Sequence, residues 1–277
     1  MTLFVSVAGR PQDPVSAEEA AEALRDRETG IAPDLLAEVV EAIRGSALGV
    51  MLYGSQARGS ADESSDVDVL QVVSRHAGAY KVGRVAVTAY TPAHLHQMAS
   101  HGSLFVLHLR TEGVVLEDAH GVVARALEAY RTPSSYNPLL GELQAAAEAL
   151  AVETPQFLEY GQALGRLGIY LLRTSLYVEA AASASPMFDI DRAAAASGDA
   201  GLAEVLAFRR ARVLSPGELQ RVREEVLRRF DPPRRGLHFA NLAVALARTH
   251  PHASALVAQV IASADSLDYA GLPLPPL

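Results

Sequence analysis

The apolar and polar residues follow different patterns on either side of a Pro- and Ser-rich stretch at residues 130–138. Before this stretch, short apolar runs bounded by Gly, Pro and Asp predict buried strands. The predicted strands are residues 48–54, 66–73, 80–91 and 114–118, the last at a sheet edge. Helical spacing predicts helices over residues 16–28, 33–45, 91–102 and 103–113. This half of the chain is therefore expected to form a sheet with flanking helices.

Beyond residue 138, Ala and Leu recur at helical spacing with few strand patterns. The predicted helices are residues 139–151, 155–182, 190–196, 201–212 and 216–230, with one or two more up to Ser266. The two patterns together predict an α+β fold of two domains. Residues 1–132 are expected to form a mixed sheet with flanking helices, and residues 133–277 an all-α bundle.

The amino-acid composition excludes some classes of function and is compatible with the predicted fold. The chain has 277 residues, 49% of them hydrophobic, and its formal net charge is −8. A net negative charge makes nucleic acid an unlikely partner, because that binding needs a basic surface. With no cysteine, thiolate metal sites and cysteine nucleophiles are excluded. No apolar run is long enough for a membrane span, and the start of the chain lacks a signal-peptide pattern, so a cytoplasmic protein is expected.

Two acidic residues, Asp66 and Asp68, lie within one predicted strand. Side chains at i and i+2 of a strand point the same way, about 7 Å apart along the strand. Two neighbouring carboxylates repel each other and require a compensating cation. Oxygen ligands favour Mg²⁺ or Mn²⁺, which also bind phosphate oxygens. The pair is therefore predicted to hold a metal ion and, through it, a nucleoside triphosphate (NTP).

A Gly-Ser pair upstream of the aspartates is predicted to bind the phosphates. Gly54 ends the preceding strand, and a residue without Cβ allows its backbone to approach a ligand. Ser55 offers a hydroxyl, and Arg58 lies one turn further along a short helix, where it can pair with phosphate oxygens. The same Asp-x-Asp pattern is also found in metal-dependent glycosyltransferases, which remain an alternative. A calcium-binding EF-hand loop is excluded, because its glycine position would be Val67 and its last position Val73.

Gly54-Ser55, ten intervening residues and Asp66-Val67-Asp68 resemble the motif of the DNA polymerase beta-like nucleotidyltransferase superfamily. The resemblance is greatest to the minimal nucleotidyltransferases, which include aminoglycoside-modifying enzymes and antitoxins paired with helical toxins. It covers residues 34–118, and it implies a nucleotidyltransferase-type mixed sheet followed by a helical domain. It further implies that Gly54 and Ser55 contact the β- and γ-phosphates and that Asp66 and Asp68 bind two catalytic metal ions.

The chain departs from this family at one position. Relatives usually carry a third carboxylate on the next strand, whereas here Ala86 and Thr88 occupy the expected positions. Two explanations are open. A glutamate of the helical domain can supply the missing base, as in some aminoglycoside-modifying relatives, and Glu159 is the residue expected to do so. Alternatively, the protein binds nucleotide without efficient catalysis.

One predicted helix face bears on this choice. Residues Glu159, Gln162, Arg166, Tyr170, Arg173 and Tyr177 form one stripe at spacings of three and four. Such a stripe is either a solvated surface or the wall of a cleft, and its tyrosines favour the cleft. In a cleft, Arg166 or Arg173 would lie near phosphate. His108, in an apolar helix, is typical of a hydrogen-bonded core residue and is a secondary candidate base.

The sequence thus predicts a Mg²⁺-dependent nucleotidyltransferase that transfers a nucleoside monophosphate, AMP from ATP, to a hydroxyl. The acceptor is expected to be a small molecule such as an antibiotic, or a protein. The alternatives are an NTP-binding antitoxin-like or regulatory protein and a metal-dependent glycosyltransferase. A homodimer is one assembly to test. A helical-toxin ribonuclease is disfavoured, because only three residues separate Arg234 from His238 and Arg248 from His252.

Overall fold

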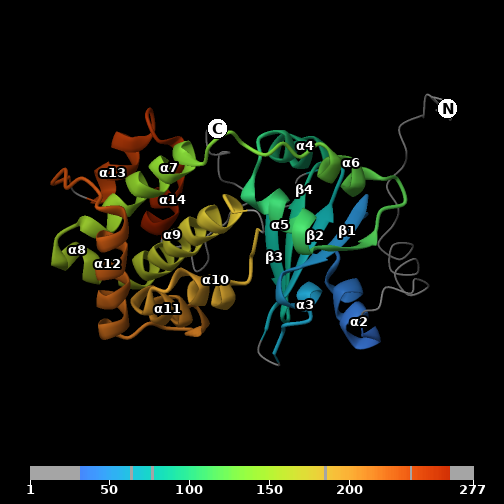
Figure 1. The fold of residues 1–277 in the computed structure, drawn as a ribbon, viewed down its shortest axis with the longest axis horizontal. Coiled ribbons are helices and arrows are strands. Elements are labelled where there is room, and N and C mark those ends of the chain that lie inside the picture. The colour runs from blue at the N-terminus through green and yellow to red at the C-terminus, as the bar shows by residue number, and fades with distance from the viewer. Residues whose placement is uncertain (1–31, 63–64, 76–77, 184–185, 238, 263–277) are drawn as a thin grey trace.

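A computed structural model describes residues 32–62, 65–75, 78–183, 186–237 and 239–262 of the chain. The described part has two lobes, a mixed sheet with flanking helices and a bundle of helices (Figure 1). The predicted α+β fold is therefore confirmed. The helix predicted over residues 16–28 lies outside the described residues, and the predicted domain boundary at residues 132 and 133 falls between helices α6 and α7.

The sheet has five strands in the order β3-β4-β2-β1-β5. The strands are β1 (Gly49–Tyr53), β2 (Val67–Val72), β3 (Gly78–Val82), β4 (Val85–Tyr90) and β5 (Val114–Glu117). Strands β2 and β4 are parallel, and every other neighbouring pair is antiparallel. The single strand predicted over residues 80–91 is wrong: the chain turns back at Gly83, whose φ is +57°, and forms the hairpin of β3 and β4.

Each face of the sheet packs against different helices, because side chains alternate along a strand. One face carries Leu52, Val67 and Val69, which are buried in a cluster with α2 (Pro33–Ala42). The opposite face carries Leu70 and Val72. Three helices pack on this second face, α4 (Pro92–Ser100), α5 (Leu104–Glu112) and α6 (Val122–Glu128). Asp68 shares its face with Leu70 and therefore points toward the side of α4 and α5.

The second lobe begins after α6 and consists of helices and short 3-10 turns. Its elements are α7 (Asn137–Ala147), η1 (Glu148–Ala151), α8 (Thr154–Glu159), α9 (Gly161–Ala181), α10 (Ile190–Ser197), α11 (Ala200–Ala207), η2 (Phe208–Arg210), α12 (Pro216–Phe230), α13 (Phe239–Leu246) and α14 (Pro251–Ile261). The long helix predicted from residue 155 to 182 is interrupted at Tyr160. The helix predicted from residue 216 to 230 agrees with α12, which the Ser215–Glu218 capping box begins.

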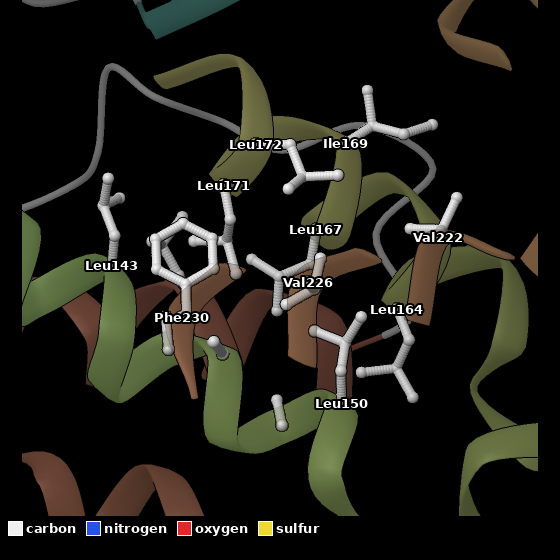
Figure 2. Close-up of a cluster of buried hydrophobic side chains, with 14 of the residues drawn as sticks. Leu143, Leu150, Leu164, Leu167, Ile169, Leu171, Leu172, Val222, Val226 and Phe230 are labelled. Carbon is white, nitrogen blue, oxygen red and sulfur yellow. The ribbon is translucent and has the colours of Figure 1, made fainter. Parts of the chain in front are cut away.

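Helix α9 is the centre of the bundle. Its Leu164, Leu167 and Leu171 are fully buried against side chains of α7, η1 and α12 (Figure 2). Gly168 allows a close approach between α9 and α12, because a Cβ there would lie 2.4 Å from Cγ1 of Val222. Among the described residues, no helix combines the length and the apolar character that crossing a membrane requires.

Candidate nucleotide site

Four residues form a row across one face of the sheet. The strand register pairs Tyr53 with Asp68, Asp68 with Ala86, and Ala86 with Lys81. Paired residues on neighbouring strands point to the same side. Asp68 is therefore flanked by a tyrosine on β1 and by an alanine on β4, with a lysine one strand further out. The position beside Asp68 on the adjacent parallel strand carries no ligand group.

Asp66 lies immediately before β2, on the same side of the sheet as Asp68. Its Oδ1 is 2.9 Å from Nζ of Lys81, and both side chains are about half exposed, at 53% and 52%. The lysine thus spans the row from β3 to the start of β2. An exposed ion pair of this kind contributes little to stability, so its geometry is open to rearrangement when a ligand binds.

Asp68 is a half-buried carboxylate in an unfavourable electrostatic environment. Burial raises the pKa of Asp68, and the neighbouring charge of Asp66 raises it further. The electrostatic effects of His108, Arg173 and Arg58 oppose this rise of the Asp68 pKa but do not cancel it. Asp66 is paired with Lys81, so Asp68 is the carboxylate whose charge the fold compensates poorly, and a bound cation would relieve that cost.

The turn that begins α3 (Gly54–Arg58) lies against the Asp68 carboxylate. Gly54 has a φ of +75°, and a Cβ there would lie 2.5 Å from Oδ2 of Asp68. Only glycine fits this combination of left-handed backbone and close contact. Ser55 follows as the second residue of α3 and is half-buried. The turn predicted to bind phosphates is thus brought directly beside the predicted metal ligand.

Arg58 is directed to the interface between the two lobes. Its Nη1 donates to Oε2 of Glu112 at 2.6 Å, and its Nε lies 3.9 Å from Oδ2 of Asp189. Glu112 also accepts a hydrogen bond from the backbone N–H of Phe188 at 3.0 Å. Burial acts to raise the pKa of Glu112, but the hydrogen bonds from His108, Arg58 and Phe188 lower it to about 2. Arg58 is therefore paired with a carboxylate that is ionised at neutral pH.

His108 on α5 is held by aromatic rings and by the same glutamate. Its ring stacks on Phe188 with centroids 4.6 Å apart and meets Tyr53 edge-on at 5.5 Å. Its Nε2 lies 3.2 Å from Oε2 of Glu112. His108 is thus a packed histidine, as its apolar helix predicts, with Nε2 beside the Glu112 carboxylate. Glu112, Phe188 and Asp189 form an interlobe contact that the sequence prediction missed, because these residues are far apart in the chain.

The structure separates the residues predicted on the helical stripe. Arg173 on α9 acts on the charge of Asp68, and the Tyr177 hydroxyl donates to the carbonyl of Phe188 at 2.9 Å, so this end of α9 faces the sheet. Arg166 is half-buried on α9, two turns earlier and about 10 Å away along the axis.

Glu159 does not belong to this stripe. It is exposed at the end of α8, beyond the break at Tyr160 and on the outer side of the bundle (Figure 1). At 1.5 Å per helical residue, roughly 20 Å of helix separates it from Arg173. The fold thus does not bring Glu159 to Asp68, and its predicted role as catalytic base has no geometric support.

The donor set fits a divalent ion only in part. Asp66 and Asp68 supply carboxylate oxygens on one side of the sheet, and phosphate oxygens of a bound nucleotide would complete the coordination of Mg²⁺. Within the described ranges, however, no three His, Asp or Glu side chains gather as a metal cluster. The nearest groups on β4 are Ala86 and Thr88, and the Thr88 hydroxyl lies 3.4 Å from the Tyr53 hydroxyl. The residues present therefore suit one ion shared with a nucleotide, and they lack a ligand for a second.

Comparison with known proteins agrees with this site. Residues 34–98 match the family model of the nucleotidyltransferase domain, a range that includes Gly54, Ser55, Asp66 and Asp68. This part of the sheet lobe, from α2 to α4, thus matches the nucleotidyltransferase domain that the motif resembles. The match covers less than a quarter of the chain and leaves the helical lobe outside it.

One solved structure is distantly similar to much of the chain. The crystal structure of a nucleotidyltransferase-like protein from Exiguobacterium sibiricum 255-15 is similar over 67% of this chain and 69% of that one. Its sequence identity is 12% and its TM-score 0.28, too low to compare the two proteins residue by residue. No curated protein matches the chain.

Proposed function

We propose that the protein is a Mg²⁺-dependent nucleotidyltransferase that transfers a nucleoside monophosphate, AMP from ATP, to a hydroxyl acceptor. The observation that carries this proposal is the contact between the Gly54 turn and Asp68 within the family-matched region. It places a phosphate-binding turn beside an undercompensated carboxylate, and a metal–triphosphate complex satisfies both. A cytoplasmic location and a small-molecule or protein acceptor belong to the same proposal.

Each site residue has a defined part in this function. Gly54 and Ser55 hold the β- and γ-phosphates with backbone amides and a hydroxyl. Asp66 and Asp68 bind the metal ion, which when bound neutralises phosphate charge. Arg173 faces the same space from the bundle and adds positive charge, whereas Arg166 and Arg58 lie further from it or are already paired.

The reaction is a displacement at the α-phosphorus. The acceptor hydroxyl loses its proton to water, its oxygen bonds to the α-phosphorus, and the bond from that phosphorus to pyrophosphate breaks. The acceptor would approach Asp68 from the side of α9, because the charge of Arg173 on α9 acts on the Asp68 carboxylate.

A second candidate is a protein that binds Mg·NTP without transferring it, as an antitoxin-like or regulatory protein would. The observation that favours it is Ala86 beside Asp68, where a third carboxylate would activate the acceptor. A glycosyltransferase has no comparable support, since the matched family is that of nucleotidyltransferases.

The test is to incubate the protein with α-³²P-labelled NTPs, Mg²⁺ and a panel of aminoglycosides and proteins, and to measure labelled acceptor and pyrophosphate. Both products are expected with the unaltered chain, and neither with the Asp66→Ala/Asp68→Ala variant. Glu204→Gln, an exposed acid on α11, is the matched control and should retain activity. Nucleotide binding without product would favour the second candidate. Binding of a UDP-sugar in preference to NTPs would favour a glycosyltransferase.

A further inference from the structure

The row across the sheet places a cation where relatives of this fold carry a carboxylate and its metal ion. Lys81 on β3 pairs in register with Ala86 on β4, and Ala86 pairs with Asp68 on β2. The short alanine side chain leaves space above β4, and the lysine extends past it to Asp66, where Nζ and Oδ1 are 2.9 Å apart. Position 86 therefore lacks an acid, and the ammonium group of Lys81 is directed to the same place.

The net charge of the site is the same with a third carboxylate and a second divalent ion, as in relatives, or with Lys81 in their place. Losing one carboxylate and one divalent ion removes a single positive charge in total, and one lysine restores it. A second divalent ion would have only carbonyl, water or shared Asp66 oxygens as ligands, and it would lie close to the ammonium of Lys81. The residues around the site therefore disfavour binding of a second ion, and Lys81 supplies the positive charge that this ion would provide.

We propose, on the basis of the nucleotide site above, that this site takes one divalent cation per nucleotide, and that Lys81 supplies the second positive charge directly to the triphosphate. Lys81 is suited to this because its present partner is an exposed carboxylate, from which it can turn to a phosphate oxygen at little cost. The lysine is thus a nucleotide-binding residue outside the Gly-Ser and Asp-x-Asp motif.

The number of bound ions tests the proposal directly. The full-length protein is saturated with α,β-methylene-ATP and titrated with Mn²⁺, and protein-bound Mn²⁺ is counted by electron paramagnetic resonance. One ion per chain is expected. The variant Lys81→Gln/Ala86→Asp, which restores an acid and removes the ammonium, is expected to bind two.

The affinity for the same analogue, measured by calorimetry, tests the role of Lys81 separately. Lys81→Gln is expected to weaken binding about tenfold, the loss typical of a charge-assisted contact. Lys81→Arg keeps the charge and should stay within about threefold. Arg75→Gln removes the same charge beyond the far end of β2 and should leave the affinity unchanged.

The outcomes separate this inference from the proposed function. Two ions in the unaltered protein, or an unchanged affinity in Lys81→Gln, would overturn the inference and leave the nucleotide site intact. If neither the analogue nor Mn²⁺ binds, the proposed function itself is wrong. Should the double variant fail to fold, as judged by circular dichroism, the ion count of the unaltered chain and the Lys81→Gln affinity still decide the question.

Discussion

Arg58 and Glu112 join the turn at Gly54 to the helical lobe. The guanidinium of Arg58 donates to the Glu112 carboxylate at 2.6 Å, and the same carboxylate accepts the backbone N–H of Phe188. Arg58 lies at the end of α3, and Phe188 precedes α10 in the bundle. The helix that begins at Gly54 is therefore tied to the second lobe through the half-buried carboxylate of Glu112.

Glu112→Gln is expected to lower the free energy of unfolding at pH 7, because the amide keeps the size of the side chain but loses the charge that Arg58 binds. The pKa of Glu112 is lowered to about 2 in the folded protein, below its ordinary value of 4.5. Its stabilising contribution is therefore present above pH 4.5 and lost as the pH falls toward 2. It amounts to at most about 3 kcal/mol.

Urea unfolding at pH 7 and pH 3 measures this contribution. The unaltered protein should lose more stability between the two pH values than Glu112→Gln does. Glu128→Gln, an exposed acid on α6, should behave like the unaltered protein. An equal pH dependence in all three proteins would contradict the role given to Glu112.

Asp68→Asn is expected to stabilise the protein and abolish its function. Because folding raises the pKa of Asp68, the ionised form destabilises the folded state at neutral pH, and that cost disappears when the group is protonated or replaced by an amide. The expected gain is on the order of 1 kcal/mol without ligand, together with a loss of Mg·NTP affinity of about tenfold or more.

The matched variant is Asp66→Asn, whose carboxylate is exposed and paired with Lys81. It should weaken nucleotide binding with a change in stability below about 0.5 kcal/mol. Calorimetry and urea unfolding of both variants provide the comparison. A less stable Asp68→Asn variant would show that the carboxylate is well compensated in the folded protein.

Gly54→Ala is expected to destabilise the fold and remove nucleotide binding. The added Cβ must occupy a left-handed backbone and would lie 2.5 Å from Asp68 Oδ2. Gly59→Ala has a similar backbone, with a φ of +68°, but no atom within 4 Å of the new Cβ. We expect about 1 kcal/mol of destabilisation for Gly59→Ala and at least about 2 kcal/mol for Gly54→Ala. Thermal unfolding measures the difference, and equal values would mean that Asp68 moves aside freely.

Gly168→Ala tests the packing of α9 on α12. Alanine has the higher helix propensity, but its Cβ would lie 2.4 Å from Val222 and 3.1 Å from Leu150. A loss of stability of about 1–3 kcal/mol is therefore expected. Gly141→Ala on α7 has no atom within 4 Å and should stabilise the protein by about 0.5–1 kcal/mol. If both substitutions stabilise, the two helices are not in close contact.

The sequence predicted those features of the site that depend on local pattern. Gly54, Ser55, Asp66 and Asp68 lie within fifteen residues of one another. Their spacing alone places a turn and a carboxylate pair at the ends of neighbouring strands, and the family match covers all four. The β3–β4 hairpin was missed because its turn, Gly83-Arg84, interrupts a run of β-branched residues only briefly.

The sequence does not predict contacts between residues that lie far apart in the chain. The partners of Glu112 lie 54 residues earlier, at Arg58, and 76 residues later, at Phe188, and no periodic pattern connects them. Arg58 was predicted to bind phosphate because it lies one turn after Ser55, and nothing in the sequence indicated a competing partner. The break at Tyr160 likewise separated Glu159 from the stripe, although the spacing of the stripe continues through it.

The position of Lys81 on β3 also affects how the edge of the sheet interacts with other molecules. Strand β3 is at one end of the sheet order, so no strand among the described residues pairs with its outer peptide groups. Such an edge can add a strand from another molecule, and charged residues on the edge oppose this. Lys81, the fourth of the five residues of β3, therefore also helps to keep the sheets of neighbouring molecules apart. Variants that remove its charge are expected to aggregate at lower concentration than the unaltered protein.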